Sequence, residues 1–387
     1  MFSSRLPDDL APNRLATAEL ALRRRGVALL DLTETNPTRV GLPYPEGLLE
    51  ALADPASIVY APEPFGLPAT RRLVAAEYHA AGLNVDPSHI VLTASTSEAY
   101  SLLFKLLCDP GDQVLVPVPS YPLFEYLTRL DLVEARPYPL AYHGTWSIDV
   151  GGVEASLGPR TRALVVVSPN NPTGSLVSRR DLDALVAICR DRRLALIGDE
   201  VFAEYPIAPR VDAARVAEQT GALTFSLGGL SKSAGLPQVK LGWLSVTGPG
   251  DLVRAALARL EVICDTYLSV STPVQLGAGR LLRGGREVRR LILDRVSGNL
   301  EALGTLAARY PACSVLAVEA GWTAVIRVPA TRSEDRLVLD LLEQDQVLVH
   351  PGYFFDFPCE AFVIVSLLPA PDEFRRGADR LLARACA

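Results

Sequence analysis

Length, composition and charge exclude several classes of protein before any motif is considered. The chain has 387 residues, 49% of them hydrophobic, which is enough for one large domain with a smaller companion. Its formal net charge of -6 argues against general affinity for nucleic acid, which needs a concentrated excess of Lys and Arg. No run reaches the roughly 18 apolar residues of a membrane span, and no secretion signal is recognisable, so we expect a cytoplasmic protein that acts on small molecules.

In chain order, strand-like apolar runs alternate with segments of helical period through most of the sequence. Strands are expected at residues 89–93, 113–118, 162–168 and 194–198. A helix is expected to begin at Ser178, because Ser178 and Asp181 have the spacing of a capping box. This alternation predicts an α/β fold, a three-layer sandwich with a mainly parallel sheet.

The pattern changes near residues 284–285, where a long helix-like stretch precedes shorter strands and a final helix. The shorter strands are expected at 323–328, 347–349 and 362–366. We therefore predict a large domain over residues 46–285 and a smaller, discontinuous α+β domain formed by residues 1–45 and 286–387.

Cysteine and histidine patterns do not predict a metal site. The six cysteines are scattered, without a Cys-x-x-Cys pair or a nearby histidine at metal-binding spacing. The four histidines form no cluster either. We interpret the cysteines as small buried apolar residues in a reducing compartment.

Lysine is rare in this chain, which narrows the candidates for amine chemistry. Of the 38 basic residues only Lys105, Lys232 and Lys240 are lysines. Lys232 lies in the segment Ser-Leu-Gly-Gly-Leu-Ser-Lys-Ser-Ala-Gly-Leu-Pro, which is too rich in Gly and Ser for an ordinary exposed helix face. A solvated surface lysine is the alternative. Lys232 is therefore the best candidate for a reactive amine.

Asp199 directly follows the expected strand at 194–198, and open α/β sheets bind their ligands at such carboxyl ends. A carboxylate there can keep the ring nitrogen of a bound pyridine-type cofactor protonated, because the negative charge stabilises the pyridinium cation. Alone, Asp199 could equally cap the next helix. Its combination with Lys232 and with the turn that contains Asn171 favours a cofactor partner.

An anion site and a flat ring are also expected at strand ends. Ser95, Thr96 and Ser97 open a helix whose amides and hydroxyls suit a phosphate, although a plain N-cap is the alternative. Tyr121 follows the strand at 113–118 and could stack on a pyridine ring, unless it is an ordinary core or surface tyrosine. An amine, an acid, a phosphate site and an aromatic surface are what pyridoxal 5′-phosphate requires of a protein.

The motifs resemble those of the class I/II aminotransferases of the fold-type I pyridoxal phosphate family. They are, in order, Asn171-Pro172-Thr173-Gly174, Asp199-Glu200-Val201-Phe202 and Ser231-Lys232 with Gly235-Leu236-Pro237. The resemblance extends from Asn36-Pro37-Thr38 to Pro351-Gly352, nearly the whole chain.

The resemblance implies a role for each matching residue. Lys232 would hold the cofactor covalently, Asp199 would contact its ring nitrogen, and Asn171 would donate to its phenolic oxygen. Tyr121 would stack on the ring. Tyr60 matches a tyrosine that reaches the phosphate from the neighbouring subunit, which implies a homodimer with shared active sites.

Four positions depart from the family pattern. Phe202 replaces a tyrosine that donates to the phenolic oxygen, and Gly229 replaces a phosphate-binding serine. Lys240 replaces a phosphate-binding arginine, so it supplies charge without the bidentate fork. Ile364 stands where the family carries the arginine that binds the substrate α-carboxylate.

Another cation is therefore needed if the substrate is an α-amino acid. Arg39 is the first candidate and Arg327 a weaker one, while ordinary surface arginines are the alternative for both. An amine, or a carboxylate bound in an unusual way, would remove the need for either.

The predicted activity is transfer of an amino group from an amino acid or amine to a 2-oxo acid, by a ping-pong mechanism in which Lys232 also moves the substrate proton. A β-lyase, or other carbanion chemistry on the same scaffold, is the alternative reaction. A cofactor-binding protein without catalysis is the alternative class.

Overall fold

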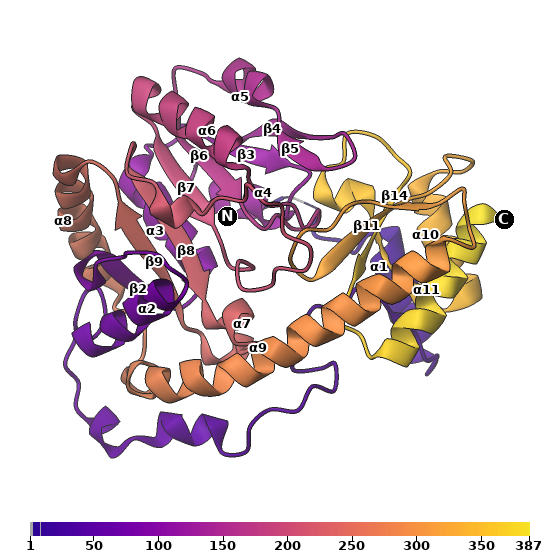
Figure 1. Ribbon diagram of the computed structural model, residues 1–387, viewed down its shortest axis with the longest axis horizontal. Helices are drawn as coiled ribbons and strands as arrows, with labels where there is room; N and C mark the ends of the chain where they lie inside the picture. The colour runs from indigo at the N-terminus through magenta and orange to yellow at the C-terminus, as the bar shows by residue number, and fades with distance from the viewer. Residues whose placement is uncertain (1–2, 8) are drawn as a thin grey trace.

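The computed structural model describes residues 3–7 and 9–387, and its largest element is an eight-stranded sheet (Figure 1). The strands lie in the order β2, β9, β8, β7, β6, β3, β4, β5. Their bounds are β2 Ile90–Thr93, β3 Gln113–Val118, β4 Glu134–Tyr142, β5 Trp146–Ile148, β6 Thr161–Val167, β7 Ala195–Asp199, β8 Thr224–Gly229 and β9 Gly242–Thr247. Neighbours from β8 to β4 are parallel, whereas β9 and β5 are antiparallel to their neighbours.

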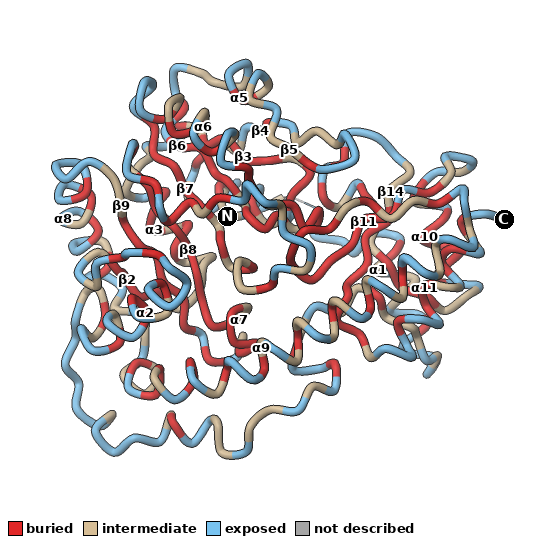
Figure 2. Tube along the Cα trace, in the orientation of Figure 1, coloured by how far each residue is buried: buried red, intermediate tan, exposed pale blue. Residues whose placement is uncertain are grey.

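Helices cover both faces of this sheet, because successive residues of a buried strand point to opposite sides. Val114 packs with α3, α4 and α8, and the next residue, Leu115, packs with α5 and α6. The helix bounds are α2 Pro68–Ala80, α3 Thr96–Leu107, α4 Leu123–Leu130, α5 Val150–Ser156, α6 Arg179–Arg192, α7 Leu230–Ser233 and α8 Gly250–Tyr267. Figure 2 shows the buried residues concentrated on the strands. The predicted three-layer α/β sandwich is confirmed.

A second, four-stranded sheet has the order β10, β11, β14, β13, and β1 pairs separately with β12. Their bounds are β1 Leu30–Asp31, β10 Ser314–Val315, β11 Thr323–Arg327, β12 Val347–Leu348, β13 His350–Pro351 and β14 Phe362–Ser366. The helices beside them are α1 Arg14–Arg24, α10 Glu334–Asp345 and α11 Pro371–Cys386. Residues from the N-terminal segment, such as Leu32, share one core with residues from this C-terminal part, such as Leu341.

Helix α9, Thr272–Ala307, runs from the large sheet to the small one (Figure 1). It begins well before residues 284–285, where the sequence pattern was expected to change. The glycines allow close packing instead of ending the helix, since a Cβ at Gly284 would crowd Leu48 and one at Gly285 would collide with Ala234. A division near residue 285 therefore falls inside one continuous helix, and the predicted domain boundary stays a proposal.

The sheet order brings distant strand ends to one edge. Strands β2, β8, β7, β6 and β3 all end there, while the antiparallel strand β9 begins there. Loops that follow parallel strands therefore meet, although the strands are not consecutive in the chain.

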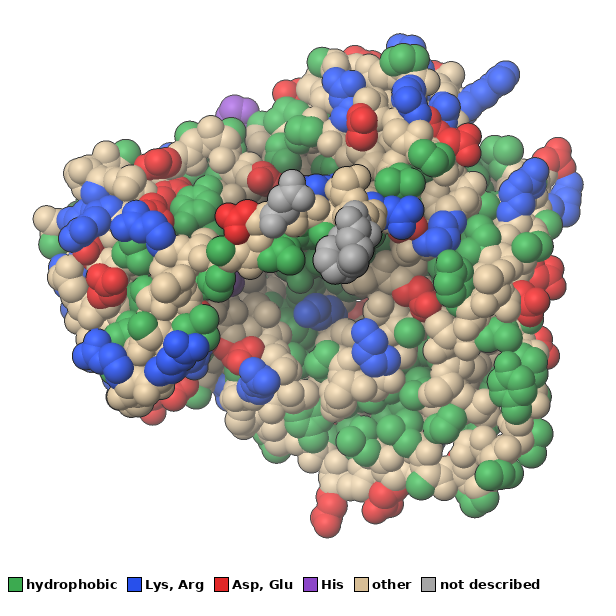
Figure 3. Space-filling model, turned by 180° about the vertical axis from the view of Figure 1, so that it is seen from behind, with side chains coloured by type: hydrophobic (Ala, Val, Ile, Leu, Met, Phe, Trp, Pro, Cys, Tyr) green, Lys and Arg blue, Asp and Glu red, His purple; other side chains and the backbone are tan. Residues whose placement is uncertain are grey.

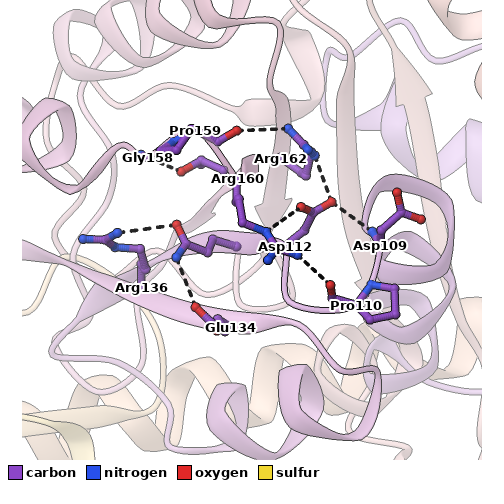
Figure 4. A network of polar contacts seen from close by, with 11 residues as sticks. Asp109, Pro110, Asp112, Glu134, Arg136, Gly158, Pro159, Arg160 and Arg162 are labelled. Carbon is purple, nitrogen blue, oxygen red and sulfur yellow. Dashed lines mark hydrogen bonds and ion pairs between the residues drawn. The ribbon is translucent and has the colours of Figure 1, made fainter.

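The opposite edge is held by a polar network around Asp112, just before β3 (Figure 4). Asp112 is buried, accepts from the Asp109 N–H, and pairs with Arg162 at 2.9 Å and Arg160 at 3.4 Å. The Asp109 N–H and the two guanidinium groups hold the pKa of Asp112 below its usual value. The network joins the start of β3 to the start of β6.

The molecular face in Figure 3 is hollowed near its centre, and a basic side chain is visible inside the hollow. Acidic and basic side chains are interspersed around it. Within the described residues, no helix is both long and apolar enough to cross a membrane.

Candidate active site

A cavity of about 330 Å³ lies at the edge where the parallel strands end. Nine of the ten predicted cofactor-site residues line it, from segments that are far apart in the chain. They are Ser95, Thr96, Ser97, Tyr121, Asn171, Asp199, Phe202, Lys232 and Lys240. The same wall contains Gly229.

The order of the strands sets the order of these groups along the cavity. The start of α3 follows β2, Lys240 precedes β9, and Lys232 follows β8, so the candidate phosphate groups are neighbours of the lysine. Asp199 ends β7, and Asn171 follows β6. A long, polar molecule with an anion at one end and a ring at the other matches this sequence of groups.

Lys232 lies in α7, a helix of four residues that directly follows β8. Its Nζ atom is 5.5 Å from the ring centroid of Phe202 and 5.2 Å from that of Trp322. The Tyr205 hydroxyl donates to the Lys232 carbonyl oxygen, which fixes the turn. Burial lowers the pKa of Lys232, while the negative charge of Asp199 opposes this shift. A lysine with a lowered pKa carries more of the neutral amine that acts as a nucleophile.

Asp199 is the last residue of β7 and is adjacent to the strand that leads to Lys232. Burial raises its pKa to about 6, although the Val201 N–H and the Tyr100 hydroxyl both donate to it. The Tyr100 Oη to Asp199 Oδ2 distance is 3.1 Å. The two hydrogen bonds do not fully offset the cost of burying the negative charge. A nearby cation, such as a protonated ring nitrogen, would therefore stabilise the ionised carboxylate.

The candidate anion site is the N-terminus of α3. Ser95 is its N-cap, with the Ser95 Oγ accepting from Glu98 N at 3.1 Å, as the sequence predicts. The first N–H groups of a helix have no intrahelical acceptor and attract anions. A Cβ at Gly242 would lie 3.0 Å from the Ser95 carbonyl carbon, so only glycine allows β9 to approach this turn so closely. Lys240 adds a positive charge at the cavity wall.

The groups around the ring position include one buried polar atom without a partner. Asn171 Oδ1 has no hydrogen-bond partner among the described residues, although Asn171 lines the cavity. Because the oxygen and nitrogen of an amide are exchangeable in assignment, this end can serve as a donor to a bound oxygen. Tyr121 is 47% exposed at the cavity. These features fit a bound pyridoxal 5′-phosphate.

Three predicted residues do not line the cavity. Tyr60 is 75% exposed, and Arg39 and Arg327 are exposed as well. Ile364 is fully buried on β14, among Trp146, Phe355 and other apolar side chains. The substrate role of Arg39 stays an untested prediction.

Sequence reasoning missed two aromatic residues of the site. Tyr100 is one helical turn beyond Thr96, so helical spacing from the anion site could have indicated it. Trp322 precedes β11, lines the cavity and packs edge-on against Phe202 with 5.2 Å between ring centroids. No local pattern identifies Trp322, because its place in the cavity depends on how the small sheet packs against the end of the large sheet.

A lysine amine, a buried carboxyl group and a helix N-terminus around one cavity, on a mainly parallel sheet, are the groups that a fold-type I pyridoxal phosphate enzyme needs. The family model for aminotransferase class I and II matches residues 45–381. The chain belongs to this family and is a pyridoxal 5′-phosphate-dependent transaminase. The β-lyase alternative is not favoured.

Curated relatives match along most of their length. Alanine aminotransferase from Mycobacterium tuberculosis is 28% identical over 372 residues, covering 93% of this chain and 86% of the relative. Glutamate-pyruvate aminotransferase AlaA from Escherichia coli is 27% identical over 363 residues, covering 91% and 89% respectively. Among solved structures, alanine aminotransferase from Pyrococcus furiosus superimposes with a TM-score of 0.89 at 22% identity, covering 99% of each chain. That structural likeness shows the fold.

Proposed function

We propose that Lys232 is the cofactor-linked amine and the proton carrier of this transaminase, and that Asp199 is the partner of the cofactor ring. The observation that carries this proposal is their meeting in one cavity from adjacent parallel strands, with the expected charge environments. The lowered pKa of Lys232 and the raised pKa of Asp199 both result from burial.

Bound pyridoxal phosphate supplies an electron-withdrawing ring that makes the substrate α-hydrogen acidic. Asp199 holds the ring nitrogen protonated, because its carboxylate stabilises the cation. Lys232, once free, removes the proton from the substrate α-carbon and delivers it again later, which is general base and general acid action by one amine.

The remaining residues hold and orient the cofactor in this proposal. Ser95, Thr96, Ser97 and Lys240 bind the phosphate, through helix N–H groups, hydroxyls and one positive charge. Asn171 donates to the phenolic oxygen, which gives its unpaired amide a partner. Phe202 and Tyr121 offer aromatic surface. Phe202 has no hydroxyl, so Asn171 is the side chain left for the phenolic oxygen.

We further propose a ping-pong reaction in which an amino acid donates its amino group to a 2-oxo acid. The names of the relatives make alanine or glutamate as donor and pyruvate as acceptor the first compounds to test. Addition of a good donor to the protein with bound cofactor should bleach the visible absorption band, and a 2-oxo acid should restore it. Initial rates at varied concentrations of both compounds should give parallel double-reciprocal lines. Release of pyruvate and ammonia without an acceptor would contradict transamination.

We propose that the protein is a homodimer in which Tyr60 completes the site of the other subunit. Tyr60 lies in an exposed run with Ile58, 89% exposed, and Val59, 62% exposed, so three consecutive side chains with apolar surface are available for a subunit contact. The family resemblance implies that Tyr60 contacts the cofactor phosphate of the other subunit.

We also propose a cytoplasmic location, which the free state of all six cysteines supports.

For the proposed homodimer, sedimentation should give twice the mass of one chain. Tyr60→Ala should weaken cofactor binding by about tenfold, the value of one lost hydrogen bond to a charged group, whereas the exposed Tyr353→Ala should not. At a cofactor concentration that leaves Tyr60→Ala largely unloaded, co-expressed Lys232→Ala and Tyr60→Ala chains should form hybrids with one intact site and more activity than either variant alone. Failure of the hybrids to regain activity would place Tyr60 outside the neighbouring site.

A further inference from the structure

The cavity contains few charged groups, and each has an assigned partner. Among the residues that line it, Lys232, Lys240 and Asp199 are the ionisable acids and bases apart from tyrosines. In the proposed function, Lys232 and Asp199 serve the cofactor ring, and Lys240 serves its phosphate. Among the described residues of one chain that line the cavity, none is a further cation for a second anion such as a substrate carboxylate.

The small sheet is apolar where it continues beyond the cavity wall at Thr323. Thr323 of β11 lines the cavity and pairs with Ser366, while Val325 pairs with Ile364 on the same face of the small sheet. Ile364 is fully buried and packs with Trp146, Phe355 and other apolar residues. No residue of β14 carries a charge.

Uncharged groups are available at this end of the cavity. The indole N–H of Trp322 is buried without a hydrogen-bond partner among the described residues, and Trp322 lines the cavity. Thr35 lines it as well, and neither Trp322 nor Thr35 has a role toward the cofactor in the proposed function. Uncharged groups bind a neutral polar substituent and a carboxylate about equally, because neither substituent can form an ion pair with them. A carboxylate therefore has no advantage over an amide there, because it forms no ion pair to offset its loss of hydration.

We propose that uncharged groups of this transaminase bind the substituent on the substrate α-carbon, where an α-amino acid carries its carboxylate. Amino acid amides and amino alcohols are then amino donors alongside α-amino acids. The inference rests on the proposed transamination and adds its substrate class. The donor loses its amino group to the cofactor together with its α-hydrogen as a proton, and the resulting carbonyl oxygen comes from water. A 2-oxo acid then accepts the amino group.

The matched donors L-alanine, L-alaninamide and L-2-aminopropan-1-ol test the proposal directly. Each is added to the protein with bound cofactor, and the second-order rate of bleaching is compared at equal concentration of free amine. We expect the rates to agree within about tenfold, whereas a site built for one polar partner rejects an analogue lacking it by about 10⁴-fold. Calorimetric titration of the same protein with propanoate and propanamide should give similar affinities, which provides a readout independent of turnover.

Variants locate the effect. Ile364→Arg should shift the preference toward L-alanine over L-alaninamide by at least about tenfold, because it adds a cation to an apolar wall. Ile364→Met should leave the ratio unchanged, and so should Arg39→Ala. If Ile364→Arg does not fold, the wild-type ratio and the calorimetric comparison still decide.

A wild-type preference for L-alanine above about tenfold would overturn the proposal, and loss of that preference in Arg39→Ala would identify the cation responsible. Failure of all three donors, and of other amino acids, to bleach the band would instead refute transamination itself. Conversion by L-alanine alone would refute only the uncharged subsite.

Discussion

Lys232→Ala is expected to abolish transamination, with a loss of about 10⁴-fold or more in turnover, because one side chain supplies both the covalent link and the proton transfer. The visible band that appears when wild type is mixed with pyridoxal phosphate should be missing from the variant. After treatment with borohydride, mass spectrometry of wild-type peptides should show one cofactor fixed to the segment that contains Lys232.

The chain offers a matched control for this experiment. Lys105 pairs with Asp131 at 2.5 Å on the other end of α3 and does not line the cavity. Lys105→Ala should therefore keep the band and the activity. Lys240 lines the cavity, so its variant tests whether the nearby amine can substitute. A band of normal intensity in Lys232→Ala would mean that the covalent link lies elsewhere.

Asp199→Asn is expected to reduce turnover by about 10³-fold, the usual cost of removing one preorganised electrostatic partner from an active site. Asparagine keeps the shape and can still accept a hydrogen bond from the Tyr100 hydroxyl, but it cannot hold a ring nitrogen protonated. Removal of the α-proton should then limit turnover more strongly. Donor deuterated at the α-carbon should therefore show a larger kinetic isotope effect in the variant than in wild type. Asp183→Asn, at an exposed position of α6 that does not line the cavity, is a suitable control. Unchanged turnover in Asp199→Asn would contradict the assigned role.

The raised pKa of Asp199 also predicts that the folding stability of the cofactor-free protein depends on pH. The pKa of Asp199 in the folded protein is raised to about 6 from 3.8, so the folded state binds this proton more tightly than the unfolded state. The resulting stability is fully present below about pH 4 and is lost as the pH rises through 6, with a change of up to about 3 kcal/mol.

Chemical denaturation at pH 5 and pH 8 measures this contribution. Cofactor-free wild type should lose more stability between these values than cofactor-free Asp199→Asn, and the comparison separates Asp199 from other groups, including Lys232. Bound cofactor should reduce the difference, because the ring cation favours the ionised carboxylate. Equal losses in both proteins would show that Asp199 does not titrate in this range.

Much of the fold follows from local sequence pattern. The strand at 113–118 and the strand at 362–366 have the expected bounds, and the N-caps Ser95 and Ser178 begin their helices as predicted. These features depend on neighbours within a few residues, so periodicity and capping are sufficient to identify them. The segment around Lys232 differs, since it forms a short helix although its Gly and Ser content argued against an ordinary exposed helix.

The candidate site is also largely readable from sequence, but for a different reason. Asp199 and Tyr121 were identified because each follows a predicted strand, and parallel strands end at a common edge. Asn171 was assigned through its family motif. Arg39 shows the limit of this reasoning: it was chosen by its nearness in sequence to a motif, and it lies outside the cavity lining.

By itself, the sequence determined the motifs, the strand ends and the identity of the lysine, because each is a local property of the chain. Only the tertiary structure decided that Lys240 lies beside the start of α3, since this depends on β2 and β9 pairing across the sheet. It also decided that Trp322 lines the cavity and that Ile364 faces an apolar cluster. Long-range packing sets these contacts, and no periodicity within one segment encodes which distant segment will cover it.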